Sequence, residues 1–186
     1  MLRRTYKMYC IYYSTNGRKV KKKFTSGRLH TNHLQIVFPS FHLRRFVVQY
    51  VPEVVKMKLL LHICCAPCSN MCIETLRQEG LTLEGFWYNP NIHPFTEYRA
   101  RRNCLREYAQ SIGLPLQEQN DYALRPFIRE VAADIDHRCV KCYTMRLCRT
   151  AQFAAENGYD AFTSSLFISP YQQHDLMRQV AEQAAV

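Results

Sequence analysis

Four cysteines of this sequence form two closely spaced pairs. Cys64 and Cys65 are adjacent, and Cys139 and Cys142 form a Cys-x-x-Cys motif much later in the chain. Thiolates at such spacings can occupy neighbouring corners of one metal centre, either a tetrahedral zinc ion or an iron–sulfur cluster. The spacing does not separate these two, and a thiol–disulfide redox pair is a further alternative. The pattern therefore predicts a soft-metal site that uses both pairs.

The remaining cysteines are weaker candidates for ligands. Cys68 and Cys72 would share one face of a helix at i and i+4; we expect Cys72 to pack, whereas Cys68 fits packing and metal binding equally well. Cys104 and Cys148 stand among apolar residues at helical spacing, and we expect both in the core. The chain has nine cysteines, an odd number, and no secretory signal, so a secreted disulfide framework is not expected.

The elements that must position these cysteines alternate between strand and helix. Short apolar runs typical of strands occupy residues 58–63, 83–88, 114–118 and 161–165. Helical periodicity occupies residues 68–79, 96–112, 125–133 and 142–157, and runs from about 172 to the end. Strands that alternate with helices form a parallel sheet covered on both faces. We therefore predict an α/β fold, a three-layer Rossmann-like sandwich with a mostly parallel sheet of about four strands.

The predicted fold determines where the cysteines meet. Parallel α/β sheets bind ligands beyond the carboxyl ends of their strands. Cys64 and Cys65 directly follow the first strand, and Cys139 and Cys142 form a turn that opens a later helix. The amino terminus of a helix favours a thiolate over a thiol. We expect both pairs at this edge of the sheet.

Charge divides the chain into two parts. The formal net charge is +10; residues 1–56 carry +11 and residues 57–186 carry −1. We expect residues 1–56 to be a basic segment that is disordered or arises from translated upstream sequence, with a nucleic-acid-binding arm and a targeting segment as alternatives. We expect residues 57–186 to be one α/β domain. No run approaches the roughly 18 to 20 apolar residues of a membrane-spanning helix, so we expect no membrane partner.

Four motifs, in the same order along the chain, resemble the QueH type of epoxyqueuosine reductase. They are His-Ile-Cys-Cys-Ala-Pro-Cys at 62–68, Tyr-Asn-Pro-Asn-Ile-His-Pro at 88–94 with Glu97-Tyr98, Arg-Cys-Val-Lys-Cys-Tyr at 138–143 with Arg146-Leu147, and Thr-Ser-Ser-Leu-Phe-Ile-Ser-Pro-Tyr-Gln at 163–172. The resemblance covers about residues 57–186, in agreement with the charge boundary. It implies reductive deoxygenation of epoxyqueuosine to queuosine at the wobble position of tRNA. Free thiols intended for a metal also indicate the reducing cytoplasm.

The resemblance further implies a [4Fe–4S] cluster held by Cys64, Cys65, Cys139 and Cys142. Removal of the epoxide oxygen as water consumes two electrons, which no ordinary side chain supplies and a cluster can. An additional iron acting as a Lewis acid is compatible with the same chemistry. An electron donor is required, and the sequence does not identify it. The family carries a Cys-x-Cys pair beyond the last motif, whereas no cysteine follows Cys148 here, so we expect the carboxyl-terminal part of the family to be missing.

Proton donors for this reaction must come from polar side chains near the strand ends. Asp121, His93 and Tyr88 are the candidate catalytic donors, and Tyr122 and Tyr143 occupy similar positions. Each of them also fits a purely structural role, because loop histidines and aspartates often form turns and caps.

Contacts to tRNA are predicted on the second helix. Arg99, Arg102 and Arg106 are three and four residues apart, so they share one face and could bind phosphates. Tyr88 or Trp87 could supply a stacking surface for a base. The alternative is a solvated helix face whose arginines pair with neighbouring glutamates.

Two other functional classes use the same residues differently. A zinc-stabilised nucleic-acid-binding module without catalysis would use the four cysteines structurally and the basic segment for contacts. A sulfurtransferase or nucleotidyl-type α/β enzyme would need a phosphate-binding loop. The sequence contains neither G-x-x-x-x-G-K-[ST] nor G-x-G-x-x-G, which disfavours that class.

Overall fold

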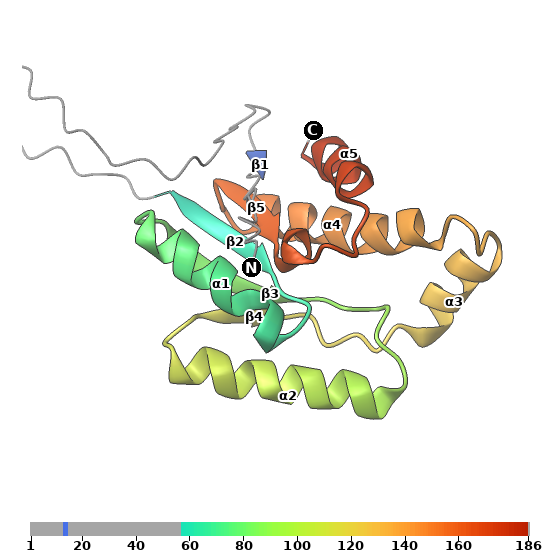
Figure 1. The fold of residues 1–186 in the computed structure, drawn as a ribbon, viewed down its shortest axis with the longest axis horizontal. Helices are drawn as coiled ribbons and strands as arrows, with labels where there is room; N and C mark the ends of the chain where they lie inside the picture. The colour runs from blue at the N-terminus through green and yellow to red at the C-terminus, as the bar shows by residue number, and fades with distance from the viewer. Residues whose placement is uncertain (1–12, 15–56, 186) are drawn as a thin grey trace, which may run out of the picture. The chain divides into compact units, whose positions relative to one another are not determined.

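The computed structural model describes residues 13–14 and 57–185 (Figure 1). Apart from Tyr13 and Ser14, the basic segment 1–56 lies outside the described residues, so its nature and the boundary at residue 57 remain predictions. In chain order the elements are β1 (Tyr13–Ser14), β2 (Lys58–His62), α1 (Ala66–Gln78), β3 (Thr82–Trp87), α2 (Phe95–Ser111), β4 (Leu116–Glu118), α3 (Leu124–Ala132), α4 (Arg138–Glu156), β5 (Ala161–Ser164), the 3-10 helix η1 (Ser165–Ile168) and α5 (His174–Ala184).

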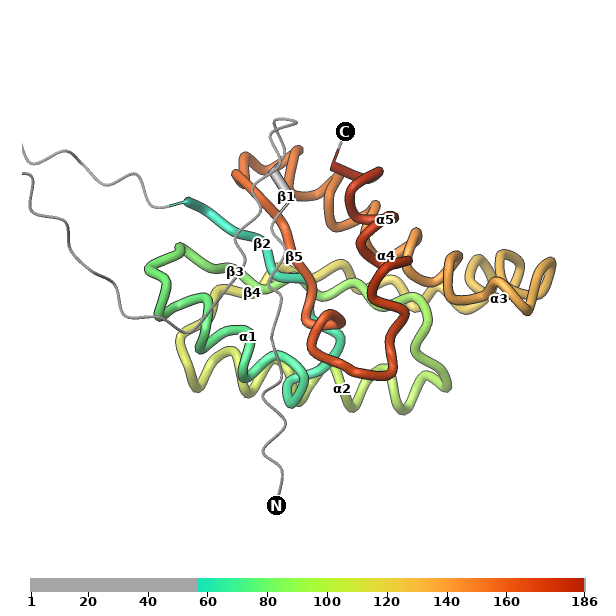
Figure 2. The backbone as a smooth tube through the Cα atoms, turned by 45° about the horizontal axis from the view of Figure 1, so that its top comes forward, coloured from blue at the N-terminus to red at the C-terminus, as the bar shows by residue number. Residues whose placement is uncertain are grey.

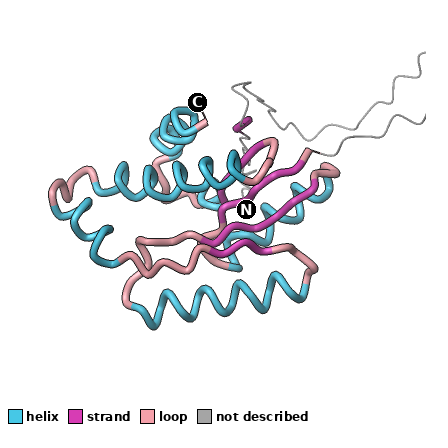
Figure 3. The backbone as a smooth tube through the Cα atoms, turned by 180° about the vertical axis from the view of Figure 1, so that it is seen from behind, coloured by secondary structure: helices cyan, strands magenta, loops and turns pink. Residues whose placement is uncertain are grey.

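The sheet, whose strands Figure 3 shows from behind, is parallel apart from one short edge strand. Its order is β1-β5-β2-β3-β4, in which β2 pairs in parallel with both β3 and β5, and β3 pairs in parallel with β4. The two-residue β1 pairs antiparallel with β5. The predicted order of strands and helices and the parallel α/β sheet are therefore confirmed.

Strand β2 is apolar at successive positions because helices cover both faces of the sheet. Leu59, Leu61 and Ile63 point to one face and pack with residues of α1 and α2. Leu60 points to the other face and packs with residues of α4 and α5. In Figure 1, α1 and α2 accordingly lie below the sheet and α4 and α5 above it. This arrangement is the predicted three-layer sandwich.

Two sequence-based expectations about individual elements are wrong. Helix α4 begins at Arg138, so Cys139 and Cys142 lie within its first turns and not in a turn before it; the backbone N–H of Val140 already bonds to the carbonyl of His137. Cys104 is exposed, because it is one residue and thus about 100° away from the buried Leu105 on α2. Cys72 is buried as expected, and Cys148 is partly buried.

The strand order creates a switch point between β2 and β5. From β2 the chain passes through α1 to β3 on one side, whereas β5 lies on the other side of β2 and is reached through α4 on the opposite face. The connections after β2 and β5 therefore lead to helices on opposite faces of the sheet. Such a switch point creates a crevice at the carboxyl ends of these two strands. In Figure 2, η1 after β5 lies beside the start of α1 after β2.

No helix in the described ranges is both long and apolar enough to cross a membrane.

Gly85 in β3 reports how tightly the core between the sheet and helices α1 and α2 is packed. A Cβ at this position would lie 3.0 Å from Ile63 Cδ1, 3.1 Å from Leu116 Cδ1 and 3.2 Å from Leu114 Cδ2. We expect Gly85→Ala to lower the free energy of unfolding by about 1 to 3 kcal/mol, because overpacking forces side chains and backbone to shift. Chemical denaturation measures this, with Gln110→Ala on the exposed surface of α2 as the control. Equal stability of both variants and the unmodified chain would contradict the packing described here.

Candidate metal centre

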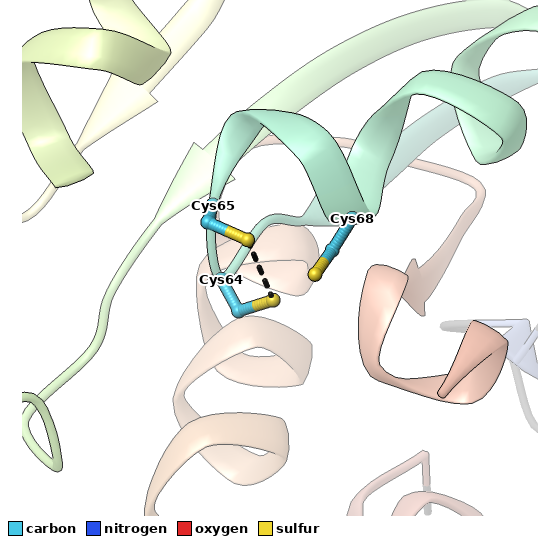
Figure 4. A group of neighbouring side chains, drawn as sticks. All are labelled: Cys64, Cys65 and Cys68. Carbon is cyan, nitrogen blue, oxygen red and sulfur yellow. Dashed lines mark hydrogen bonds between the residues drawn. The ribbon is translucent and has the colours of Figure 1, made fainter. Parts of the chain in front are cut away.

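Three cysteine sulfurs meet at the switch point. Cys64 and Cys65 follow β2 directly, and Cys68 lies in the first turn of α1. Their Sγ atoms all lie within 4.8 Å of one another, and Cys64 Sγ and Cys65 Sγ are 3.8 Å apart. Figure 4 shows the three sulfurs turned toward a common point. Sulfurs at these distances can bind one metal ion or one cluster. Of the two alternatives for Cys68, this geometry favours metal binding.

The start of α1 supplies a favourable electrostatic environment for these sulfurs. Helix α1 begins at Ala66 with Cys65 as its N-cap, and a proline stands in the first helical positions. No side chain caps the helix, so its first N–H groups and the positive end of its dipole are available to nearby sulfur. This end of the helix therefore stabilises thiolates.

Helix α4 brings the second cysteine pair to the same side of the sheet. Cys139 and Cys64 both pack against the core formed with α4 and α5. Cys142 Sγ lies 3.9 Å from Nη1 of Arg146, one turn later in α4. Arg146 in turn lines the same cavity as Cys64. Among the described residues, only the set of Cys64, Cys65 and Cys68 has all its sulfurs within 4.8 Å, so the predicted four-cysteine ligand set remains a proposal.

A cavity of about 240 Å³ opens in front of the three sulfurs. Its lining comes from the segment after β2, α1, the loop after β3, α2, α4 and the segment after β5, namely Cys64, Cys65, Cys68, Asn91, Ile92, Arg101, Arg146, Ser165, Leu166, Ser169 and Gln172. Two of its polar atoms, Asn91 Oδ1 and Arg146 Nε, are buried without a hydrogen-bond partner in the described part of the chain. The cavity therefore joins thiols, guanidinium groups and unsatisfied polar atoms in one space.

Hydrogen bonds hold the Cys64 segment against the end of β5. Ser165 Oγ accepts from the backbone N–H of Cys64 at 3.2 Å and donates to its Sγ at 3.5 Å. The hydrogen bond with Cys65 lowers the pKa of Cys64 to about 5, assisted by Ser165 and by the charge of Arg146, against the opposite effect of burial. The pKa of Cys65 is raised by the same hydrogen bond, and that of Cys68 by burial. A metal would therefore displace protons mainly from Cys65 and Cys68.

Behind the cysteines lies the fully buried His62. Its Nε2 lies 3.1 Å from the carbonyl oxygen of Tyr88, and its Nδ1 lies 2.8 Å from Ser164 Oγ. The carbonyl can only accept, so Nε2 carries the proton and Nδ1 accepts from the serine. Burial, followed by the charge of Arg146, lowers the pKa of His62 to about 3. His62 is therefore a neutral element of the scaffold.

The predicted proton donors lie outside the cysteine cavity. Tyr88, His93 and Asp121 are absent from its lining among the described residues. His93 packs against Tyr122 at a ring distance of 5.2 Å, and Asp121 accepts a hydrogen bond from the neighbouring Gln119. Tyr143 is more closely connected to the cavity.

The hydroxyl group of Tyr143 donates to Gln172 Oε1 at 2.7 Å, and Gln172 lines the cavity. Burial raises the pKa of Tyr143, so this hydroxyl remains protonated at neutral pH and can donate. Among the tyrosines that the sequence analysis considered, Tyr143 is thus the one tied to the site by a hydrogen bond through a lining residue.

The residues predicted to contact tRNA differ in their partners and in their exposure to solvent. Arg106 is held by Glu118 in a two-pronged ion pair with distances of 2.7 Å from both Nε and Nη2. Arg102 bonds to Asn120 at 3.3 Å, and Arg99 lies over the ring of Phe95 at 6.0 Å. Trp87 has no exposed surface and cannot stack on a base, because β3 is buried on both faces. The arginine of α2 that lines the cavity is Arg101, which the predicted stripe did not include.

Arg146 and Ser165 lie in the motifs of the family resemblance, but sequence reasoning assigned neither of them a role in the site. Arg146 stands among the apolar positions of α4, one turn after Cys142, and an arginine within an apolar stripe is the signal that could have identified it. Ser165 follows β5 as Cys64 follows β2, so only the pairing of these two strands reveals that they meet.

The buried neutral His62 predicts acid lability of the fold. Its pKa is about 3 in the folded chain and near 6.5 in the unfolded chain, so the unfolded state binds the extra proton as the pH falls below about 6.5. We expect the free energy of unfolding to fall by up to about 1.4 kcal/mol per pH unit between pH 6 and 4 from this group. Urea titrations of the unmodified chain and His62→Gln at several pH values measure it. Identical pH slopes for the two proteins would contradict the assignment.

Comparisons with known proteins identify the family to which this sequence is similar. The model of the family described as Epoxyqueuosine reductase QueH matches residues 59–186. A protein named epoxyqueuosine reductase QueH from Dehalococcoides mccartyi is 43% identical over 117 residues, which are 63% of this chain and 64% of the relative. Proteins of the same name from Histophilus somni and Acinetobacter baylyi are 36% and 37% identical, each over 69% of this chain and over 54% and 61% of the relatives.

The chain thus spans less than two thirds of the length of each of these three relatives. The family match nevertheless runs without interruption from β2 to the last residue, and includes every cysteine of the candidate centre. On this match, the chain belongs to the epoxyqueuosine reductase QueH family.

Proposed function

We propose that this chain is the catalytic domain of a reductase that converts epoxyqueuosine in tRNA to queuosine. The observation that carries the proposal is the gathering of thiols and guanidinium groups around one cavity at the switch point of the sheet. The printed names of the relatives supply the substrate and the reaction. A tRNA substrate and free thiols agree with a cytoplasmic location.

The donor atoms of the site fit a [4Fe–4S] cluster. We propose as its ligands Cys64, Cys65, Cys139 and Cys142, with Cys68 next to them for an additional iron. All five are thiols, the ligand type that clusters and soft metals require. The ends of α1 and α4 on which they lie favour the net negative charge of such a centre. When bound, the cluster would supply the electrons for the deoxygenation, and an additional iron would supply Lewis acidity at the epoxide oxygen.

The protein residues around the sulfurs would bind and orient the modified base. Asn91 Oδ1 is a buried acceptor without a partner in the described part of the chain, so it suits a hydroxyl group of the substrate. Ser169 and Gln172 line the same wall and can donate to or accept from further hydroxyl groups. Arg101 on α2 lines the cavity and is paired with the exposed Glu97 at 2.6 Å; it can exchange this partner for a phosphate next to the bound nucleotide.

The proton for the departing oxygen can come from Tyr143, whose hydroxyl group Gln172 positions at the cavity; the amide of Gln172 does not itself relay a proton, so the hydroxyl would donate directly to the substrate. The Tyr143 hydroxyl is hydrogen-bonded to the Gln172 side chain and also accepts from the backbone N–H of Gln173 at 3.2 Å. This hydroxyl is hydrogen-bonded to a residue of the lining, and it joins the proposed donors Tyr88, His93 and Asp121. Burial lowers the pKa of His93, which makes the imidazole neutral and a weak donor at pH 7.

The surface of α2 is the proposed contact for the anticodon loop. Phe95 is 48% exposed at the start of this helix, and Arg99 lies over its ring. Exposed aromatic rings next to arginine stack on unpaired bases and bind their phosphates. Phe95 thus replaces Trp87 as the proposed stacking residue, with Arg99, Arg102 and Arg106 as phosphate contacts. The same helix carries Arg101 into the cavity, so a bound loop would lie beside the sulfurs.

A zinc-stabilised nucleic-acid-binding module is the second candidate. Three sulfurs within 4.8 Å of one another suit zinc as well as a cluster. The cavity in front of the sulfurs favours the reductase, because a structural zinc site is closed by its four ligands and leaves no open position.

Metal content separates these two functions. After anaerobic reconstitution we expect about four irons with matching sulfide per chain and broad visible absorption, as for a [4Fe–4S] cluster. Cys64→Ser and Cys139→Ser should lose most of this iron, because each removes a thiolate ligand. Cys104→Ser, an exposed cysteine on α2, is the matched control and should keep it. Tightly bound zinc without sulfide would establish the module instead.

Activity is measured with dithionite as the reductant, which replaces the unidentified electron donor. We expect the reconstituted chain to convert epoxyqueuosine in a tRNA anticodon stem–loop to queuosine, as detected by mass spectrometry of the nucleosides. Tyr143→Phe should lower the rate about 100-fold if this hydroxyl supplies the proton, with unchanged iron content. An equal rate for Tyr143→Phe would exclude Tyr143 as the donor and leave Tyr88, His93 and Asp121.

Binding of the anticodon stem–loop tests the surface of α2 separately from chemistry. We expect Phe95→Ala to weaken binding by about 1 to 3 kcal/mol, since base stacking on an aromatic ring contributes that much. Arg99→Gln should weaken binding and also reduce its salt dependence. Met71→Ala, an equally exposed apolar residue on α1, is the control. Fluorescence anisotropy measures the affinity, and equal affinities for Phe95→Ala and Met71→Ala would place the RNA on another surface.

A further inference from the structure

Arg146 is a buried cation at the centre of the site. Only 4% of its surface is exposed, and it lies on the face of α4 that packs against the sheet. An unpaired charge in such a position costs several kcal/mol unless another group compensates it. The arrangement around Arg146 therefore has to contain its counter-charge.

Carboxylates do not provide this counter-charge. Among the described residues, Arg146 forms no ion pair with an aspartate or glutamate, whereas Arg101, Arg106 and Arg149 each do. Its Nη2 donates to the neutral amide of Asn89 at 2.8 Å, and its Nε is buried without a partner. The groups near Arg146 that can carry negative charge are the cysteine sulfurs, with Cys142 Sγ at 3.9 Å.

Arg146 also connects the two cysteine segments. On one side its Nη1 reaches Cys142 on α4. On the other side its Nη2 holds Asn89, whose own side-chain N–H₂ donates to the carbonyl of Ile63 at 2.9 Å, directly before Cys64. Asn89 is fully buried, so this bridge is shielded from water. A single guanidinium thus joins the strand that carries one cysteine pair to the helix that carries the other.

We propose that Arg146 is a positioning residue of the metal centre, in which it compensates the negative charge of the cysteine sulfurs and, through Asn89, holds the Cys64–Cys65 segment against the Cys139–Cys142 helix. This inference rests on the proposed metal-binding function of the cysteines. To serve both ends of the bridge, a side chain needs a planar group with several donors. The guanidinium group of arginine is such a group, whereas the ammonium group of lysine is not. Charge and geometry are therefore separable by substitution.

The test compares Arg146→Gln, Arg146→Lys and Arg149→Gln, each reconstituted anaerobically. Arg149 is the matched control. It lies on the same helix, three residues after Arg146, and contacts Gln119 and Glu156. The measurements are iron per chain, the rate of iron release to a chelator, and the midpoint potential of the bound centre followed by visible absorption. Circular dichroism verifies that each variant is folded.

Loss of the bridge should speed iron release roughly 10-fold in both Arg146 variants, the effect of removing a group that orients metal ligands. Loss of the charge should move the midpoint potential to more negative values in Arg146→Gln alone, because a nearby cation favours the reduced, more anionic centre. Arg149→Gln should change neither quantity. If Arg146 were only a scaffold contact and did not compensate charge, Arg146→Gln and Arg146→Lys would have equal midpoint potentials. That result would overturn the charge-compensating part of the proposal.

Release rates and potentials at the level of the unmodified chain in folded Arg146→Gln would overturn the proposal. If that variant does not fold, Arg146→Lys decides by its release rate, and an unchanged rate overturns the bridge. Failure of the proposed function has a different signature, namely that the unmodified chain takes up zinc and no iron or sulfide. The release of zinc from the same variants then tests the role of Arg146 independently.

Discussion

The site depends on the proximity of a buried guanidinium to a group of thiols. Arg146 is almost completely buried, and its hydrogen bonds lead to Asn89 on one side and to Cys142 on the other. A cation of this kind is stable in the interior only beside negative charge, and closely spaced thiolates are stable only beside positive charge. Each group therefore makes the burial of the other possible. The amino-terminal ends of α1 and α4 add to the same balance, since the positive ends of the two helix dipoles lie where these cysteines stand in the chain.

The topology of the sheet determines where this balance of charges is placed. Strand β2 pairs with β3 on one side and β5 on the other, and the helices that follow or precede these strands cover opposite faces. The crevice between the loops is therefore a property of the strand order and would exist with other side chains. In this family member the lining includes cysteine, serine and arginine, and the cysteine sulfurs are ligands suited to a soft metal. Fold and chemistry are thus separable, and the function rests on the side chains.

The proposed substrate contacts and the proposed metal centre share one wall of the cavity. The loop after β3 contributes Asn89 to the bridge behind the sulfurs and Asn91 to the cavity in front of them. The next element, α2, carries Arg101 into the cavity and Phe95 onto the surface. A single stretch of chain therefore contributes in succession to the bridge behind the sulfurs, to the cavity and to the proposed RNA surface.

The sequence by itself determined the order of the elements and the two cysteine pairs, because apolar periodicity and residue spacing are local properties. Strand β2 and the neighbouring strands lie where short apolar runs predicted them. One cysteine pair follows β2, and the other lies at the beginning of α4. Only the tertiary structure decided which residues share the cavity. Cys68, Arg101, Arg146 and Ser165 come together through strand pairing and helix packing, which depend on contacts between residues far apart in the sequence. The same reason explains two wrong predictions, a stacking role for Trp87 and a core position for Cys104. The packing of β3 and α2 determines which side of each element faces solvent, and it buries Trp87 and exposes Cys104.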